Sequence, residues 1–313
     1  MRAAQQEFLR FLPSARVFST FQTVARLVYR DRWRQLLRHR RRQEEMYLPL
    51  IRARKEQRRT RDTTATTTYV DTLLDLKVPA DGDRRRNLTD GEMVGLVSEY
   101  LGAATEMVVA QLEWTLANLT RQPDIQTRLR SEVEAAAGGE PCAYLRAVVM
   151  ESLRRHPPVS SVQRHMACDV TLGTTRVARG NVVSFAIEEI GRDNKAWAWP
   201  EEFSPERFMA GGEGEGVRLA VGSKQEKAAK VKMMPFGAGR RTCPGMGYAM
   251  LHLEYFLANL VAAFEWRRVP GREEEEAVDL TADYGFITTM RHPLRALVVP
   301  RTAMVAPAPA VAL

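Results

Sequence analysis

The sequence contains few of the residues that build disulfide frameworks or zinc centres. Its 313 residues include only three cysteines and five histidines. Cys142, Cys168 and Cys243 form no CxxC pair and no even set, which argues against a disulfide framework and is typical of a reducing compartment. The histidines are scattered and show no zinc-ligand spacing. We therefore expect neither structural disulfides nor a zinc-stabilised fold.

Long apolar runs are also missing. No stretch of eighteen or more apolar residues occurs, and no signal peptide precedes Phe8, so we expect no transmembrane segment in this chain. Gly212-x-Gly214 and Gly237-x-Gly239 lack the third glycine and the strand context of a dinucleotide-binding turn. The sequence therefore does not predict a nucleotide site.

Positive charge is concentrated in one segment. The net charge is +8, and residues 30–61 hold thirteen Lys or Arg and four Asp or Glu, a balance of +9 that leaves −1 for the remaining chain. Interleaved apolar residues predict a helix with an apolar side and a cationic outer face. We interpret this basic segment first as a solvated helix face and second as a surface attracted to anionic lipid. Nucleic-acid binding is not expected without a recognised module, and a non-enzymatic interaction protein that uses the basic segment stays an alternative hypothesis.

The spacing of apolar residues predicts a mainly α-helical chain with small β-sheets. Helices are expected at residues 21–42, 90–120, 125–137, 141–155 and 246–264, and strands at 170–172, 182–185 and 286–299. Residues 211–216 and 273–276 are expected to form loops, and residues 302–313 a disordered tail. No linker divides the chain, so residues 1–313 are predicted to form a single domain.

The most informative motif is the cysteine loop, the run from Phe236 to Gly245 that presents one cysteine to a predicted helix. Only the thiolate form of cysteine is a good metal ligand. Cys243 lies just before the helix, where unpaired N–H groups and the positive dipole end favour an anion, and Arg241 adds positive charge. Glycines at positions 237 and 239 let the loop turn close to a flat ligand. The alternative interpretation is a buried structural cysteine.

This loop resembles the haem-binding loop of the cytochrome P-450 superfamily. Phe, Gly, Arg, Cys and Gly recur in that family at the spacing that this sequence holds with Phe236, Gly239, Arg241, Cys243 and Gly245. The resemblance implies a cytochrome P-450 fold, haem as the cofactor and the thiolate of Cys243 as the axial ligand of the iron.

The haem propionates of such a protein need cationic partners. The resemblance assigns one of them to Arg241. A second is expected after His156-Pro157-Pro158, where counting forward from the prolines gives His165 and counting back from Asp169 gives Arg164. Both assignments stay open, with a preference for Arg164.

Two further segments resemble a charge cluster of the same family. Glu151-Ser-Leu-Arg154 is similar to its Glu-x-x-Arg helix motif, and Pro205-Glu-Arg207-Phe208 to the segment that supplies a second arginine. A carboxylate and two guanidiniums can satisfy one another when they are buried together. We expect Glu151, Arg154 and Arg207 to form such a cluster and to tie the helix to the cysteine loop.

The family's helix on the oxygen side of the haem corresponds to residues 99–114. Its usual acid is present as Glu106, but its usual threonine is replaced by Met107, whose thioether cannot organise water as a hydroxyl does. Thr105 could still support proton delivery. Methionine at position 107 leaves two alternative functions open. One is a catalytically impaired haem-binding fragment, and the other is a haem-thiolate isomerase or dehydratase.

The resemblance implies a haem-thiolate monooxygenase that inserts one atom of dioxygen into an apolar small molecule. Its electrons would come from NADPH through NADPH–cytochrome P-450 reductase, at the cytosolic face of the endoplasmic reticulum membrane. The sequence is most similar to plant microsomal A-type enzymes of secondary metabolism, in particular family eighty-nine. It corresponds to a C-terminal portion of the family, without the membrane anchor and the Trp-x-x-x-Arg helix that covers the haem, so contact with the membrane surface is expected of the full-length form.

Overall fold

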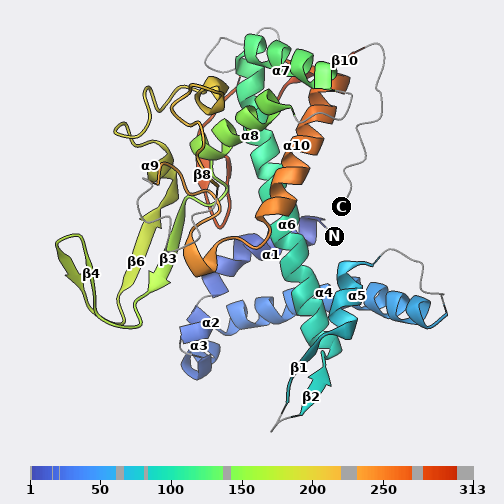
Figure 1. The fold of residues 1–313 in the computed structure, drawn as a ribbon. Coiled ribbons are helices and arrows are strands. Elements are labelled where there is room, and N and C mark those ends of the chain that lie inside the picture. The colour runs from blue at the N-terminus through green and yellow to red at the C-terminus, as the bar shows by residue number, and fades with distance from the viewer. Residues whose placement is uncertain are drawn as a thin grey trace. The chain divides into compact units, whose positions relative to one another are not determined.

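The computed structural model describes residues 2–15, 17–20, 22–60, 67–80, 84–136, 142–219, 231–269 and 278–301. Helices dominate and the strands are short, which confirms the prediction of a mainly α-helical chain with small β-sheets (Figure 1). The chain divides into two compact units, residues 1–106 and 107–313, and the division falls within helix α6. The single domain inferred from the sequence stays a prediction.

The first unit is built from helices and one hairpin. Its elements are α1 (Arg2–Ala15), α2 (Val17–Thr20), α3 (Gln22–Val28), α4 (Arg30–Thr60), α5 (Tyr69–Asp75), β1 (Lys77–Pro79), β2 (Arg85–Asn87) and the first half of α6 (Asp90–Arg121). Tyr47 and Ile51 of α4 pack against Val94 of α6 in its core. Beside this core, the side-chain amide of Gln5 donates to the Ser98 carbonyl (3.0 Å). The side-chain amide of Gln43 donates to the Ser98 hydroxyl (2.8 Å). These buried hydrogen bonds fix α1 and α4 on α6.

The second unit combines helices with antiparallel strand pairs. After α6 come α7 (Pro123–Ala135), α8 (Ala143–Arg155), β3 (Ser161–His165), β4 (Val170–Leu172), β5 (Thr175–Val177), β6 (Val182–Ala186), α9 (Ile187–Gly191), the 3₁₀ turns η2 (Pro205–Phe208) and η4 (Gly239–Arg241), α10 (Met246–Ala263), β7 (Phe264–Arg267), β8 (Ala282–Tyr284), β9 (Thr288–Met290) and β10 (Leu297–Pro300). In the described ranges the strands pair as β3 with β6, β4 with β5, β7 with β10 and β8 with β9.

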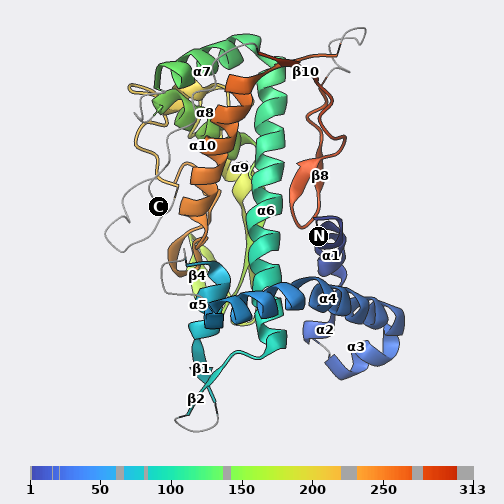
Figure 2. The same cartoon turned by 90° about the vertical axis from the view of Figure 1, so that its right-hand side faces the viewer.

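The core of the second unit lies where α7, α8 and α10 gather around the C-terminal half of α6 (Figure 2). Leu119 of α6, Leu129 of α7, Val148 of α8 and Leu257 of α10 are fully buried there. Apolar stripes at helical spacing on these four helices meet in one cluster. This packing fixes the position of α10, and the cysteine loop leads directly into its N-terminal end.

Several predicted boundaries were wrong. The expected helix over 21–42 is two helices, because the backbone leaves the helical conformation at Tyr29, and α4 then continues through Pro49 to Thr60. Burial of Tyr47 and Ile51 favours this continuation in spite of the proline. Helix α1 was missed, although Ala4 and Phe11 of that helix are buried.

The predicted strand over 286–299 is two strands, β9 and β10, which belong to different sheets. The expected helix over 246–264 ends at Ala263, since Phe264 begins β7. Residues 211–216 form turns as expected, but Gly214 is buried against Arg207 and Phe208. The predictions for 273–276 and for the 302–313 tail lie outside the described residues.

Among the described residues one helix, α6, is long and apolar enough to cross a membrane by length and composition alone. Its sequence holds no uninterrupted run of eighteen apolar residues because acidic residues such as Glu99 and Glu106 interrupt it. Trp114, Ala117 and Leu119 of this helix are completely buried by protein. These side chains are therefore core residues of the second unit.

Candidate haem site

The cysteine loop is closed by its own backbone. The Cys243 N–H donates to the Phe236 carbonyl (2.8 Å). Gly237 and Gly239 have φ angles of 74° and 68°, in the left-handed region that side chains disfavour. The first helical bond of α10 runs from the Ala249 N–H to the Gly245 carbonyl (2.8 Å). The loop therefore ends where α10 begins and places the cysteine beside the helix N-terminus.

Cys243 is exposed, which disagrees with the alternative of a buried structural cysteine. A Cβ on Gly245 would lie 3.9 Å from its sulfur, within ordinary van der Waals contact. Arg240 and Arg241 are exposed in η4, and neither forms an ion pair with any residue that the structure describes. An accessible thiol beside two available cations is a donor set that fits an anionic, metal-bearing ligand such as haem.

The two candidates for the second propionate partner lie on opposite faces of β3. Arg164 pairs with Val183 of β6 and His165 with Val182, so neighbouring side chains alternate between the faces. Arg164 is half-buried, on the face of Val162, whereas His165 is exposed. Only one of the two can face a given flat ligand, and the choice stays a prediction.

The structure brings Glu151, Arg154 and Arg207 together in the interior of the second unit. Glu151 is completely buried. Arg154 donates to its carboxylate from Nε (2.7 Å) and Nη2 (2.8 Å), which makes a bidentate pair. The Nε of Arg207 lies 3.5 Å from the same carboxylate, and the Ser204 N–H donates to it at 2.8 Å. Both arginines therefore share one buried negative charge.

The remaining N–H groups of Arg154 donate to backbone carbonyls. They bind Gly191 (2.8 Å), Pro200 (2.8 Å) and Glu202 (3.1 Å). A Cβ at Gly191 would lie 2.4 Å from the Arg154 carbonyl, so only glycine allows this close approach. These acceptors could not be predicted from the sequence, because every residue has a carbonyl group. Gly191, just before Arg192, was the one usable signal, since a glycine can mark a close approach of two backbones.

The side chain of Arg207 binds a turn at Trp199 whose backbone conformation is unusual. Its Nη2 donates to the Trp199 carbonyl (2.7 Å), and its Nη1 contacts the Ala198 carbonyl and Glu213. Trp199 has a φ of 46°, which is rare for a bulky side chain. The arginine therefore explains how a strained turn persists beside the charge cluster.

The charge cluster reaches the cysteine loop indirectly. The described bonds of Arg154 and Arg207 end on residues between 151 and 213, not on the loop itself. Trp197, which lies under the Arg154 guanidinium at 5.3 Å, donates through Nε1 to the Lys232 carbonyl (2.9 Å), a few residues before the loop. The expected direct tie is therefore replaced by one that passes through Trp197.

His156 follows α8 and is buried against α6. Its ring stacks on Trp114, with the ring centroids 4.2 Å apart and an interplanar angle of 3°. Its Nε2 has no hydrogen-bond partner within the described ranges. Burial, followed by the charges of Arg155 and Arg192, holds the pKa of His156 well below its ordinary value. The imidazole is therefore a neutral packing group in the folded chain.

The residues expected on the oxygen side of the haem lie in an uninterrupted stretch of α6. Thr105 is exposed, Glu106 is buried and Met107 is half-buried. Gln6 of α1 donates to the Glu106 carboxylate at 2.9 Å. Sequence reasoning could not find this contact, since α1 itself was not predicted.

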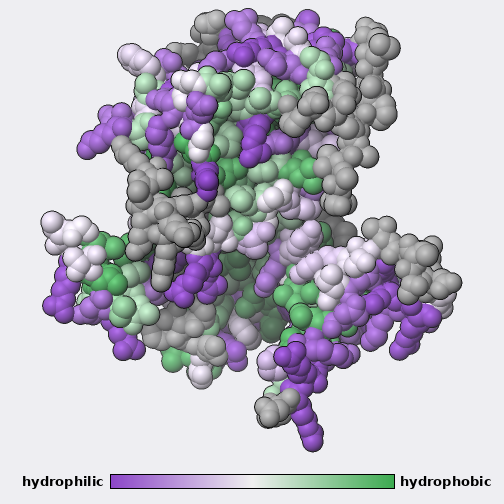
Figure 3. Space-filling view, viewed as in Figure 1, coloured by the Kyte–Doolittle hydropathy of each residue, from purple (hydrophilic) through white to green (hydrophobic). Residues whose placement is uncertain are grey.

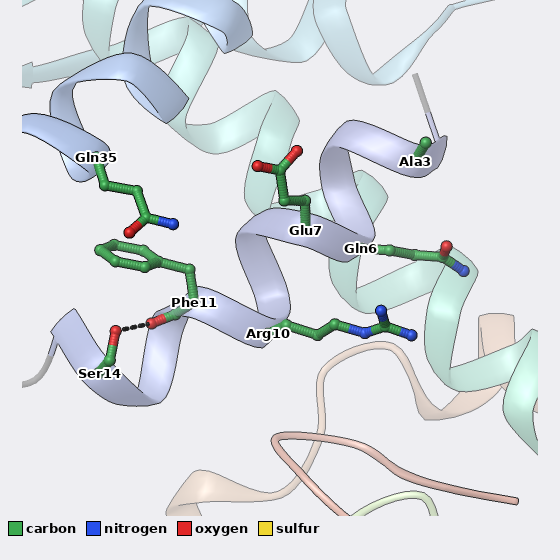
Figure 4. A pocket seen from close by; sticks show the side chains of 7 residues that line it. All are labelled: Ala3, Gln6, Glu7, Arg10, Phe11, Ser14 and Gln35. Carbon is green, nitrogen blue, oxygen red and sulfur yellow. Dashed lines mark hydrogen bonds between the residues drawn. The ribbon is translucent and has the colours of Figure 1, made fainter. Parts of the chain in front are cut away.

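A pocket in the first unit does not involve the predicted site residues. It has a volume of about 540 Å³ and lies against α1, where Gln6, Glu7 and Arg10 give it a polar wall (Figure 4). A second cavity of about 470 Å³ in the other unit is lined by Gln126, Trp266 and Arg301, among others. Most residues that line the two cavities are polar or charged, whereas a site for an apolar substrate is expected to be lined mainly by hydrophobic and aromatic residues.

Comparison with known proteins gives the wider context. A model of the cytochrome P-450 family matches residues 1–292. The chain is 37% identical to cytochrome P-450 89A9 of Arabidopsis thaliana over 95% of its length and 59% of that protein. It is 34% identical to cytochrome P-450 78A11 of Oryza sativa subsp. japonica over 74% of its length and 41% of that protein.

A third relative is the flavonoid 3'-monooxygenase of Arabidopsis thaliana, which is 31% identical over 76% of this chain and 47% of its own length. The chain thus spans about half the length of the curated relatives it matches. The predicted likeness to plant enzymes, including family eighty-nine, is confirmed. Cytochrome P-450 proteins bind haem through a cysteine thiolate, which agrees with the cofactor expected from the loop. On the extent of the family match, this chain belongs to the cytochrome P-450 family.

Proposed function

We propose that the protein is a haem-thiolate monooxygenase that acts on an apolar small molecule. The observation that carries the proposal is the exposed Cys243, held in a backbone-closed glycine loop at the start of α10. Its accessible sulfur and the helix N-terminus beside it suit an axial thiolate. When bound, the haem would supply dioxygen binding and activation, a chemistry that side chains alone do not provide.

The chain's own residues would bind the cofactor and tune its surroundings. Cys243 would supply the thiolate, while Phe236, Gly239 and Gly245 shape the loop around it. Arg241 would bind one propionate, and either Arg164 or His165 the other. Glu151, Arg154 and Arg207 would fix the segment that supports the loop through Trp197, so their role is structural.

Proton handling would belong to α6. Glu106 would accept or release protons, and the Thr105 hydroxyl would stand in for the threonine that Met107 replaces. This substitution is the specific observation in favour of a second candidate, a haem-binding protein with impaired monooxygenation. A haem-thiolate isomerase or dehydratase, which would need no such proton relay, is the third candidate.

The proposed partner is NADPH–cytochrome P-450 reductase, and the proposed location is the cytosolic face of the endoplasmic reticulum membrane. One relative is a flavonoid 3'-monooxygenase, and its name supports oxygen insertion into a small molecule. The direct test reconstitutes the haem-loaded chain with NADPH and this reductase in the presence of apolar compounds and labelled dioxygen. The proposal expects a product with one labelled oxygen atom.

Other outcomes of this assay separate the candidates. Bound haem without consumption of NADPH would identify the impaired protein. An isomerised or dehydrated product that carries no labelled oxygen would identify the isomerase class. Absence of haem binding would contradict all three and favour the non-enzymatic interaction protein.

A further inference from the structure

The second unit contains a cavity that lies apart from the residues assigned to the haem. Its volume is about 470 Å³, and it lies at the C-terminal end of α6, beside the start of α7 and the antiparallel pair of β7 and β10 (Figure 2). Figure 3 shows hydrophilic side chains gathered over α7 at this end of the unit. We call it the β7 cavity. Its volume is within the range of about 300–1,000 Å³ that is typical of small-molecule sites.

The walls of the β7 cavity are fixed by hydrogen bonds between its elements. The Nε2 of Gln126, which is buried on α7, donates to the carbonyls of Leu119 (3.1 Å) and Trp266 (2.9 Å). Its Oε1 accepts from the Trp266 N–H (2.9 Å). The Arg301 N–H, just after β10, donates to the Ala263 carbonyl (3.0 Å). These bonds connect α6, α7, β7 and the end of β10, so the cavity is formed without a ligand.

Arginines dominate the charged lining of the β7 cavity. Among the described residues that line it, Arg267, Arg268 and Arg301 are cationic and Glu265 is acidic. Arg267 donates to the Glu265 carboxylate from Nε (2.7 Å) and Nη2 (2.8 Å), so these two charges neutralise each other. Arg268 donates from Nη2 to the Arg121 carbonyl (3.0 Å). Such a lining favours an anionic ligand over a neutral or cationic one.

Arg301 has a guanidinium whose charge the described residues compensate poorly. Its Nε is enclosed by protein and has no hydrogen-bond partner among them. The acids that influence it, Glu265 and Glu134, form their ion pairs with Arg267 and Arg130. Burial, followed by the charge of Arg130, lowers the pKa of Arg301. A bound anion would therefore supply the charge partner that Arg301 lacks in the described part of the chain.

We propose that the β7 cavity binds a small organic anion through a carboxylate or phosphate group that contacts the Arg301 guanidinium. Both groups offer several oxygens to the planar fork of arginine and form charge-assisted hydrogen bonds with it. Thr127 of α7 is exposed at the same cavity and can donate from its hydroxyl. Trp266 also lines the cavity and offers an apolar surface to the organic part of the ligand.

This ligand differs from the apolar substrate of the proposed function, because its charged group is what the cavity recognises. The test is isothermal titration calorimetry of the haem-loaded full chain with inorganic phosphate, with succinate and with uncharged glycerol, at an ionic strength held constant with potassium chloride. We expect saturable binding of phosphate, succinate or both, and none of glycerol. The stronger of the two anions identifies the ligand group as phosphate or carboxylate. The Soret band should not shift, since the anion binds away from the iron.

Variants of the arginine locate the binding site. Arg301→Gln should weaken anion binding by about tenfold or more, because a charge-assisted hydrogen bond is lost. Arg301→Lys, which keeps the charge but not the planar fork, should weaken it less. The matched control is Arg179→Gln, at an exposed arginine in the turn between β5 and β6, which should bind as the unaltered chain does.

A second pair of variants tests the same cavity without changing a partly buried arginine. Thr127→Glu adds a carboxylate at the cavity and should abolish anion binding, whereas Thr127→Gln, of similar size but uncharged, should retain it. Unchanged helicity in circular dichroism shows that each variant folds. Failure of the unaltered chain to bind either anion would overturn the proposal, as would equal binding by the unaltered chain, Arg301→Gln and Thr127→Glu.

Discussion

At the scale of single residues, the buried charge cluster shows the clearest link between sequence and stability. Arg154 is 1% exposed and makes five hydrogen bonds, two to Glu151 and three to backbone carbonyls. The three side chains of the cluster could be selected from the sequence. Their carbonyl acceptors, the strained Trp199 and the link through Trp197 could not, because they depend on how distant segments pack.

We predict that Arg154→Ala destabilises the folded chain by about 3–5 kcal/mol, because it leaves the Glu151 carboxylate buried with fewer partners. Chemical denaturation measures the change. Arg154→Lys should recover only part of it, since an ammonium cannot form the bidentate pair. The matched control is Arg146→Ala, whose ion pair with Glu254 is exposed and should contribute less than about 1 kcal/mol. Equal losses for Arg154→Ala and Arg146→Ala would contradict this account.

His156 gives a prediction for pH. Its folded-state pKa is depressed, whereas histidine in an unfolded chain titrates near pH 6.5. Below about pH 6.5 the unfolded state therefore binds more protons than the folded state, and stability falls as the pH decreases. His156→Phe keeps an aromatic ring against Trp114 but cannot titrate, so its unfolding midpoint should vary less between about pH 7 and 5.5. A flat profile in the unaltered chain would refute the prediction.

At the scale of elements, apolar periodicity predicted the helices of the second unit well. Residues 90–120, 125–137 and 141–155 correspond to α6, α7 and α8 with shifts of about two residues, because each has a clear apolar stripe. Periodicity gave wrong bounds where tertiary packing overrides local signals, as in α4, which continues through Pro49. It also failed for α1, whose Pro13 lies inside the helix.

Helix α6 contains Met107 in place of the family's usual threonine, the substitution that bears most on activity. Met107→Thr should place a hydroxyl in this helix at little cost in packing, since Met107 is only half-buried. If the missing hydroxyl limits proton delivery, the variant should raise the ratio of product formed to NADPH consumed. Met107→Val, similar in shape to threonine but without the hydroxyl, is the control. An equal ratio in the unaltered chain and both variants would show that the substitution at position 107 is not limiting.

At the scale of the whole molecule, the two units present different surfaces. The first exposes the apolar side chains of Val24, Leu27 and Val28 on α3. The second exposes Cys243 next to Arg240 and Arg241, which form no ion pair with a described residue. The thiol and its loop were predicted from the sequence, since local spacing alone defines them. The exposure of the apolar side chains on α3 was not, because it depends on which face of the helix the rest of the unit covers.

The central claim is that Cys243 binds the haem iron through its thiolate. The most direct measurement is the difference spectrum of the reduced, haem-loaded chain with and without carbon monoxide, recorded for the unaltered protein and for Cys243→Ser. We predict the red-shifted Soret band of thiolate ligation in the unaltered protein and its loss in the variant, with Cys168→Ser unchanged. Identical spectra for the unaltered protein and Cys243→Ser would contradict the account.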